Sequence, residues 1–139
     1  MSHSPPELRA RCPVRSCPVT ERKNLGDFGE RIAAHRLEAD GLTIIARNAR
    51  LPAGEVDIIA REAADLVFVE VRTRRAGAGL AAESITDTKR ERMWRCAMQY
   101  CEANALDPET ARLDLVTVDV AADGRVAALE HFRGLELPG

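Results

Sequence analysis

Residues 54–72, GEVDIIAREAADLVFVEVR, contain two apolar runs joined by a short polar segment. Runs rich in valine, isoleucine and phenylalanine are typical of β-strands, and two such runs a few residues apart form an antiparallel hairpin. We expect strands over 55–61 and 66–73, with a four-residue turn at 62–65 between them. This hairpin sets the register of the sheet and therefore the side chains that share each face.

Counting back from the turn predicts four cross-strand pairs: Arg61 with Leu66, Ile59 with Phe68, Asp57 with Glu70, and Glu55 with Arg72. Because side chains alternate between the two faces of a strand, the last three pairs share one face. That face begins apolar near the turn and becomes ionic at its far end. The other face is an apolar layer: Val56, Ile58, Val67, Val69 and Val71.

The predicted ionic end sets the carboxylates of Asp57 and Glu70 opposite each other. Like charges repel at the ~5 Å that separates such β-carbons, so a cation has to compensate them. Arg72 is one candidate, and a divalent ion held by carboxylates and waters is the other. An ordinary solvated charge ladder with Arg72, Arg47 and Arg50 is an equally open interpretation of the pattern.

The rest of the chain alternates between helical and extended patterns. Apolar residues recur at helical spacing after Asn24, a possible cap, and the pattern stops at Gly41. The members of this stripe are Leu25, Phe28, Ile32, Ala33 and Leu37. Further segments are predicted as a strand over 42–51, a loop over 74–82, a helix over 84–105, and strands over 112–120 and 125–132. The order α-β-β-β-α-β-β predicts an α/β protein with a mixed sheet flanked by helices.

Composition fits one domain behind a short leader. The chain has 139 residues, of which 45% are hydrophobic, enough for one ordinary core. Residues 1–22 hold four of the seven prolines and predict a flexible leader, which leaves 23–139 as the folded domain. A net charge of −2 gives no general attraction to nucleic acid, although residues 1–23 carry five basic side chains against two acids.

The four cysteines predict neither zinc nor export. Both pairs, Cys12 with Cys17 and Cys96 with Cys101, are five residues apart, which is not a zinc-ligand spacing and sets helical thiols on different faces. Free thiols, or a buried Cys96, fit a cytoplasmic protein. No signal peptide is apparent, and no apolar run approaches the ~18 residues of a membrane span.

Five short motifs carry a family resemblance: NLGDFGE at 24–30, RNAR at 47–50, GEVDIIA at 54–60, VFVEVR at 67–72 and LDLV at 113–116. Together they resemble the YraN family of uncharacterised bacterial proteins. That family is similar to the PD-(D/E)XK nucleases of restriction-endonuclease-like fold, especially the archaeal Holliday-junction resolvases. The resemblance covers residues 23–135 and implies an αβββαβ core.

The resemblance implies a metal-dependent phosphodiesterase site. In it Asp57 and Glu70 bind Mg²⁺ or Mn²⁺, Glu30 adds a carboxylate, and the main-chain carbonyl of Val71 contributes. The ion would orient and acidify a water and polarise the scissile phosphate. The candidate catalytic residues are therefore Asp57, Glu70, Glu30 and Arg72.

Arg72 departs from the nuclease pattern, which has lysine at this place. Lysine can lose its proton in a desolvated site, whereas arginine stays protonated. Arg72 can clamp a phosphate or neutralise the Asp57 and Glu70 pair, but it cannot act as a general base. Two alternatives to a nuclease follow: a DNA-binding module without hydrolysis, and a protein-binding adaptor whose DNA binding would be absent at any salt concentration.

Candidate phosphate contacts surround the predicted site: Arg47 and Arg50 on the first strand, Arg74 and Arg75 on the loop, and Lys89, Arg90, Arg92 and Arg95 on the second helix. Contacts of this kind make binding salt-sensitive and poor at reading sequence. The resemblance to resolvases implies branched or otherwise structured DNA as the partner. Because acids interleave with the helical group, a solvated helix face is the alternative. Two cuts in opposed strands would require a homodimer.

Overall fold

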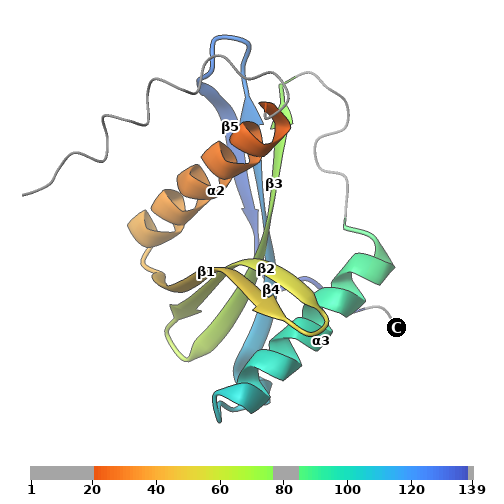
Figure 1. Ribbon diagram of the computed structural model, residues 1–139. Helices are drawn as coiled ribbons and strands as arrows, with labels where there is room; N and C mark the ends of the chain where they lie inside the picture. The colour runs from red at the N-terminus through yellow and green to blue at the C-terminus, as the bar shows by residue number, and fades with distance from the viewer. Residues whose placement is uncertain (1–20, 77–84, 138–139) are drawn as a thin grey trace, which may run out of the picture.

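The computed structural model describes residues 21–76 and 85–137, which form two α-helices, one 3₁₀-helix and five strands (Figure 1). In chain order these are α2 (Glu21–Ala39), β1 (Thr43–Leu51), β2 (Gly54–Glu62), β3 (Asp65–Arg75), α3 (Asp87–Ala103), η2 (Pro108–Thr110), β4 (Ala111–Val120) and β5 (Val126–Phe132). The predicted order of helices and strands is confirmed. The predicted leader lies outside the described residues except for its last two positions, which are part of α2.

The five strands form one sheet in the spatial order β1-β2-β3-β4-β5. Neighbouring strands are antiparallel, except that β3 and β4 run parallel. A parallel pair requires a crossover, and α3 lies in the connection between these two strands. The protein is therefore α/β with a mixed sheet, and its first six major elements follow the αβββαβ order of the expected core.

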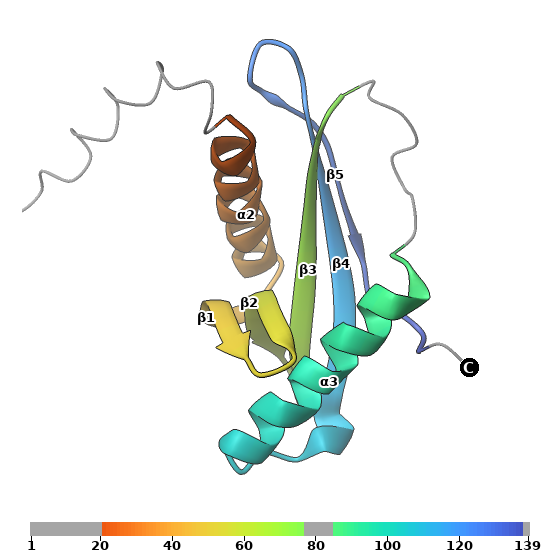
Figure 2. The same ribbon diagram turned by 45° about the vertical axis from the view of Figure 1, so that its right-hand side comes forward.

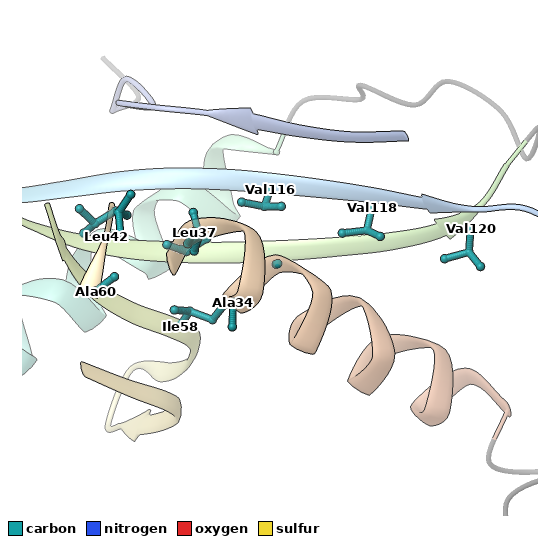
Figure 3. Close-up of a cluster of buried hydrophobic side chains, with 11 residues drawn as sticks. Ala34, Leu37, Leu42, Ile58, Ala60, Val116, Val118 and Val120 are labelled. Carbon is teal, nitrogen blue, oxygen red and sulfur yellow. The ribbon is translucent and has the colours of Figure 1, made fainter. Parts of the chain in front are cut away.

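Helix α2 covers one face of the sheet (Figure 2). Its buried residues Ala33, Ala34 and Leu37 recur at helical spacing and pack on valines and isoleucines of the strands. Figure 3 shows this cluster, which continues along β4 from Val116 to Val120. Gly41, at φ 102°, follows the helix in the left-handed conformation that ends many helices.

Helix α3 covers the opposite face (Figure 2). Its residues pack on Phe68 of β3, whose ring meets that of Tyr100 edge-on at 5.8 Å between centroids. Cys96 and Cys101 are both free thiols buried in this one cluster, so the prediction that they lie on different faces is wrong. The reason is that α3 contacts β1, β2, β4 and η2, which widens its buried face.

Gly29 allows α2 to approach the sheet closely. A β-carbon at this position would lie 1.9 Å from Oγ1 of Thr73 and 2.8 Å from its Cβ. No other residue type fits there without moving the helix away from β3. The next residue, Glu30, is thereby held against the sheet.

The predicted hairpin register is confirmed near the turn and fails beyond it. Arg61 pairs with Leu66 and Ile59 with Phe68, but the turn itself has only two residues, 63–64. The ladder between β2 and β3 ends where Ile58 pairs with Val69, so the predicted cross-strand pairs of Asp57 with Glu70 and of Glu55 with Arg72 are absent.

Beyond that point β2 remains paired only with β1. Val56 packs in the α3-side cluster, although Ile58 packs on the α2 side. The prediction that these two residues share a face is therefore wrong. Strict alternation holds only while a strand stays in the sheet plane defined by its neighbours.

Neither described helix, α2 or α3, is both long enough and apolar enough to cross a membrane.

Candidate active site

Asp57 lies on β2 directly beyond the end of its ladder with β3. It has no partner in either ladder, although its neighbours Val56 and Ile58 pair with Ala49 and Arg47 of β1. Across from it, Asn48 has φ 54°, a left-handed conformation that asparagine tolerates better than most residues. The Asp57 carboxylate fills the place of the missing ladder bond, because its Oδ2 accepts a hydrogen bond from the Val71 N–H at 2.8 Å.

Glu70, on β3, meets a cation from α3. The Lys89 ammonium lies 3.1 Å from Glu70 Oε2, and the Glu70 side chain is only 13% exposed. Lys89 stands in the first turn of α3, where its main-chain N–H donates to the Thr86 hydroxyl at 3.1 Å. The N-cap of α3 therefore fixes the point from which this lysine reaches the sheet.

Glu30, on α2, approaches from the opposite face and is buried. Its Oε1 accepts hydrogen bonds from Asn48 Nδ2 at 3.2 Å and from an Arg47 Nη at 3.3 Å. Both helices and three strands thus contribute side chains around Asp57. We use the term carboxylate site for Asp57, Glu70, Glu30, Asn48 and Lys89.

The pKa of Asp57 reflects its burial and the acids around it. Burial, followed by repulsion from Glu70 and then from Glu30, raises the pKa of Asp57 to about 7. The Val71 N–H and the Lys89 ammonium oppose the rise without cancelling it. The three acids, Asp57, Glu70 and Glu30, outnumber the two described cations that contact them, Lys89 and Arg47, which favours an added cation.

Hard oxygen ligands of this kind suit Mg²⁺ or Mn²⁺. Within residues 24–76 and 85–137, no three His, Cys, Asp or Glu side chains are grouped closely enough to hold a metal ion among themselves. Because Mg²⁺ is commonly bound by one or two carboxylates and several waters, the donor set fits an ion held by Asp57 and Glu70. Glu30 is engaged by Arg47 and Asn48.

Arg72, one of the two candidate cations for Asp57 and Glu70, pairs with neither acid. Where the structure describes the chain, its guanidinium forms no ion pair and no hydrogen bond, and Lys89 instead contacts Glu70. Arg72 is paired along β3 with Thr117 of β4. The prediction failed because it used only the hairpin, whereas the cation comes from a helix that follows it in the chain.

Arg74 and Arg75 belong to β3, so the prediction that they lie on a loop is wrong. They pair with Asp119 and Val120, and one Arg74 Nη lies 3.3 Å from Asp119 Oδ1. The parallel ladder with β4 extends the strand past the apolar run that marked it in the sequence. Five residues of strand separate Arg75 from Glu70, about 16 Å, so these arginines lie away from the carboxylate site.

The remaining predicted phosphate contacts lie on β1 and on α3. Arg50 is exposed on β1, and Arg92 is exposed on α3 with its side chain against Gly54. The β1–β2 hairpin and α3 lie side by side (Figures 1 and 2), joined by a hydrogen bond from Ala53 N–H to Gln99 Oε1 at 2.9 Å. Arg95 is also exposed, whereas Arg90 is paired with Asp87 on its own helix.

A second ionic cluster surrounds Asp114 on β4. This fully buried carboxylate accepts two hydrogen bonds from Arg112 at 2.9 Å, one from Gly134 N–H at 3.0 Å, and contacts His131 Nε2 at 2.7 Å. Although desolvation raises the pKa of Asp114, the hydrogen bonds from His131, Arg112 and Gly134 outweigh it and lower that pKa. Its partners come from β4, β5 and the segment after β5, so it is separate from the carboxylate site.

Sequence reasoning missed the roles of Asn48 and Thr86. Asn48 belongs to the RNAR motif, its side chain donates a hydrogen bond to Glu30, and its backbone has a positive φ opposite Asp57. An asparagine between two strand residues is a usable signal, because asparagine is enriched at positive φ. Thr86 was hidden because the predicted helix began at Ser84, three residues before the observed start of α3 at Asp87 and outside the described residues.

A family model with the description "Uncharacterised protein family UPF0102" matches residues 29–118. The chain belongs to this family. A UPF0102 protein of Roseiflexus castenholzii is 46% identical over 113 residues, which cover 80% of this chain and 91% of that protein. One from Dehalococcoides mccartyi is 45% identical over 117 residues, covering 83% and 97%. Membership of UPF0102, the YraN family of the sequence resemblance, is thus confirmed.

Among solved structures, Pyrococcus furiosus SfsA in complex with Ca²⁺ aligns with this UPF0102 chain at a TM-score of 0.41 and 14% identity. The alignment covers 84% of this chain and 65% of that one.

Proposed function

We propose that this UPF0102 protein is a metal-dependent phosphodiesterase of the PD-(D/E)XK type that acts on structured or branched DNA. The observation that carries the proposal is the pair of acids at the point where β2 leaves β3. Asp57 and Glu70 come from adjacent strands, are close enough to raise the pKa of Asp57, and are approached by one lysine. Paired acids with an unbalanced negative charge are what a hard divalent ion requires.

In this proposal Asp57 and Glu70 hold Mg²⁺ or Mn²⁺. The bound ion would polarise a phosphate oxygen and lower the pKa of a coordinated water. The Val71 N–H orients the Asp57 carboxylate, and Asn48 and Arg47 keep Glu30 beside it without the ion. Arg72 remains protonated and takes no proton from water.

DNA would approach over the β1–β2 hairpin and α3. Arg50 and Arg92 are exposed there on neighbouring elements, and their charge suits phosphate oxygens. Arg74 and Arg75 lie too far along β3 to contact the same phosphate. A branched substrate cut in two opposed strands needs two carboxylate sites, so the proposal includes a homodimer.

The proposal is tested with a labelled four-way junction, a duplex and a single strand. We expect Mn²⁺-dependent cleavage by the wild type, strengthened in Arg72→Lys, and a loss of roughly 100-fold or more in Asp57→Asn and Glu70→Gln. Both carboxamide variants keep the shape of the side chain and are checked by circular dichroism. Cleavage that survives in both variants would rule out the carboxylate site as the catalytic centre.

A DNA-binding module without hydrolysis is the second candidate, and one observation favours it. Lys89 already contacts Glu70, and a lysine that stays there would exclude the ion. Such a module would bind the same DNA in EDTA as in Mn²⁺ and cleave none of it. Salt-dependent binding without cleavage, in the wild type and in Arg72→Lys, would establish this candidate over the nuclease.

A further inference from the structure

Lys89 reaches the carboxylate site from an element that carries neither acid. Its ammonium lies 3.1 Å from Glu70 Oε2, with 36% of the lysine side chain and 13% of the glutamate side chain exposed. The pair is therefore partly shielded from solvent, where an ion pair is screened less than on an open surface. It joins the start of α3 to the middle of β3.

The helix start that holds Lys89 is well anchored. Thr86 caps the first turn through its hydroxyl, and Ile85, directly before it, is buried in the α3-side core. The main chain of Lys89 is therefore fixed, while the four-carbon side chain remains free to swing. Because its main chain is fixed and its side chain is flexible, the Lys89 ammonium can pair with the Glu70 carboxylate and can also move away from it.

No other side-chain cation contacts the Asp57 and Glu70 pair in the described part of the chain. Arg47 is directed to Glu30, and Arg72, although two residues from Glu70 on the same strand, forms no ion pair. Asp57 receives only a main-chain N–H. Among the side chains that the structure describes, Lys89 is thus the cation that offsets the charge of this pair.

We infer that Lys89 is the internal counter-ion of the Asp57 and Glu70 pair, and that a divalent cation displaces its ammonium from Glu70 in order to bind. The inference rests on the proposed function, because it concerns the same two carboxylates. Lys89 and the ion compete for one oxygen, and their like charges also repel. Lys89 is thereby a positioning residue that keeps Glu70 in place until an ion arrives.

Competition between Lys89 and the ion predicts that removing the lysine raises the affinity for the ion, whereas most substitutions in a binding site lower it. Replacing Lys89 by methionine removes the competing charge while keeping an unbranched side chain, so Mn²⁺ should bind more tightly than to the wild type. The expected gain is roughly five-fold or more, because two unit charges about 4 Å apart contribute that factor even with the screening of bulk water, and this partly shielded pair is screened less. A lysine with a purely structural role would give weaker or unchanged Mn²⁺ binding.

Isothermal titration of the full chain with MnCl₂ alone, without DNA, measures this directly. Lys89→Arg keeps the charge and should retain the wild-type affinity within about two-fold. Arg95→Met makes the same change of charge at an exposed position of the same helix and should leave Mn²⁺ affinity unaltered. Lys89→Gln is a second neutral variant, measured alongside in case the methionine variant is poorly folded.

The outcomes distinguish the counter-ion role of Lys89 from the metal site itself. Tighter Mn²⁺ binding in both neutral variants, but not in Lys89→Arg or Arg95→Met, supports the counter-ion. Equal affinity in the wild type and the neutral variants overturns the counter-ion and leaves the metal site standing. Absence of Mn²⁺ binding from every variant at millimolar concentration overturns the metal site and the counter-ion together.

Discussion

Asp57 and Asp114 are aspartates of the same sheet in opposite electrostatic situations. Asp114 is fully buried and surrounded by donors from Arg112, His131 and Gly134, which together lower its pKa. Asp57 is less buried, receives one main-chain N–H, and has its pKa raised to about 7 by burial and by neighbouring acids. One carboxylate is satisfied within the protein, and the other is not.

The difference separates a structural acid from a candidate functional one. A buried carboxylate that has all its donors stabilises the folded state through them and leaves nothing for a ligand. A carboxylate placed beside other acids destabilises the folded state at a pH where it is ionised, because like charges repel. A cation bound to it would restore that stability. Both aspartates lie in motifs of the family resemblance, and the sequence alone does not distinguish them. Their different hydrogen-bond partners in the structure do.

The largest expected effect comes from Asp114→Ala. The change removes the buried carboxylate that Arg112, His131 and the Gly134 N–H share, although Arg112 keeps its contacts with Glu62 and Asp65. Breaking a buried ion pair in this way costs about 3 to 5 kcal/mol in the free energy of unfolding. Urea denaturation followed by the fluorescence of Trp94, the single tryptophan, measures it. The effect should be the same with EDTA and with Mn²⁺.

Arg133→Ala is the matched control at the edge of the same cluster. Its pair with Glu62 is about half-exposed on the arginine side, and such a pair contributes roughly 0 to 1 kcal/mol. If Asp114→Ala were no more destabilising than Arg133→Ala, the Asp114 cluster would not be the structural member of the comparison.

Gly29→Ala should lower the stability by an intermediate amount. It concerns the carboxylate site because the neighbouring Glu30 lies on the same helix. The added methyl would overlap Thr73 and push α2 from β3, at a cost of about 1 to 3 kcal/mol for overpacking. Thermal denaturation measures the loss, and a further Thr73→Ala change should restore part of it because the hydroxyl and methyl groups are removed.

Gly26→Ala supplies the control in the same helix. No atom lies within 4 Å of a β-carbon there, so the change should be neutral or stabilising by up to about 1 kcal/mol through helix propensity. Similar losses at both glycines would contradict the close approach of α2 at Gly29.

Asp57→Asn should have the smallest effect on stability, with a distinctive pH dependence. Because the folded-state pKa of Asp57 lies above its ordinary value of 3.8, the native state binds the extra proton and wild-type stability falls as pH rises from about 4 to 7. In EDTA the variant should match the wild type at pH 4 and exceed it by about 1 to 2 kcal/mol at pH 8, allowing for partial exposure.

Asp114 gives the opposite slope, since its lowered pKa supplies stability that is lost as pH falls through the acid range. Glu130→Gln, which removes a charge from an exposed side chain of β5, is the control for the pH series. A constant difference between Asp57→Asn and the wild type from pH 4 to 8 would show that Asp57 does not titrate abnormally.

Much of the fold could be predicted because its signals are local. The apolar stripe of α2, the stop at Gly41 and the two strands around the 63–64 turn each depend on residues within a few positions of one another. Element order followed from these signals. The register held from Glu62 to Ile58, as far as the hairpin itself continues.

The carboxylate site was predicted only in part. Asp57, Glu70 and Glu30 were selected correctly as neighbours in space, since Asp57 responds to both of the other acids. Arg72 and a divalent ion were the two candidate cations, and Lys89 was predicted only as a phosphate contact, because periodicity ranks residues by their place along one strand. Which helical lysine arrives at a strand depends on where the helix is packed.

The sequence by itself determined the α/β order, the hairpin and the presence of two acids at its ionic end, because alternating and helical spacings directly encode burial. Only the tertiary structure decided that Lys89 meets Glu70, that Asn48 donates to Glu30, and that Asp114 lies in a separate cluster. These contacts join elements far apart in the chain, and their geometry depends on how both helices pack across the sheet.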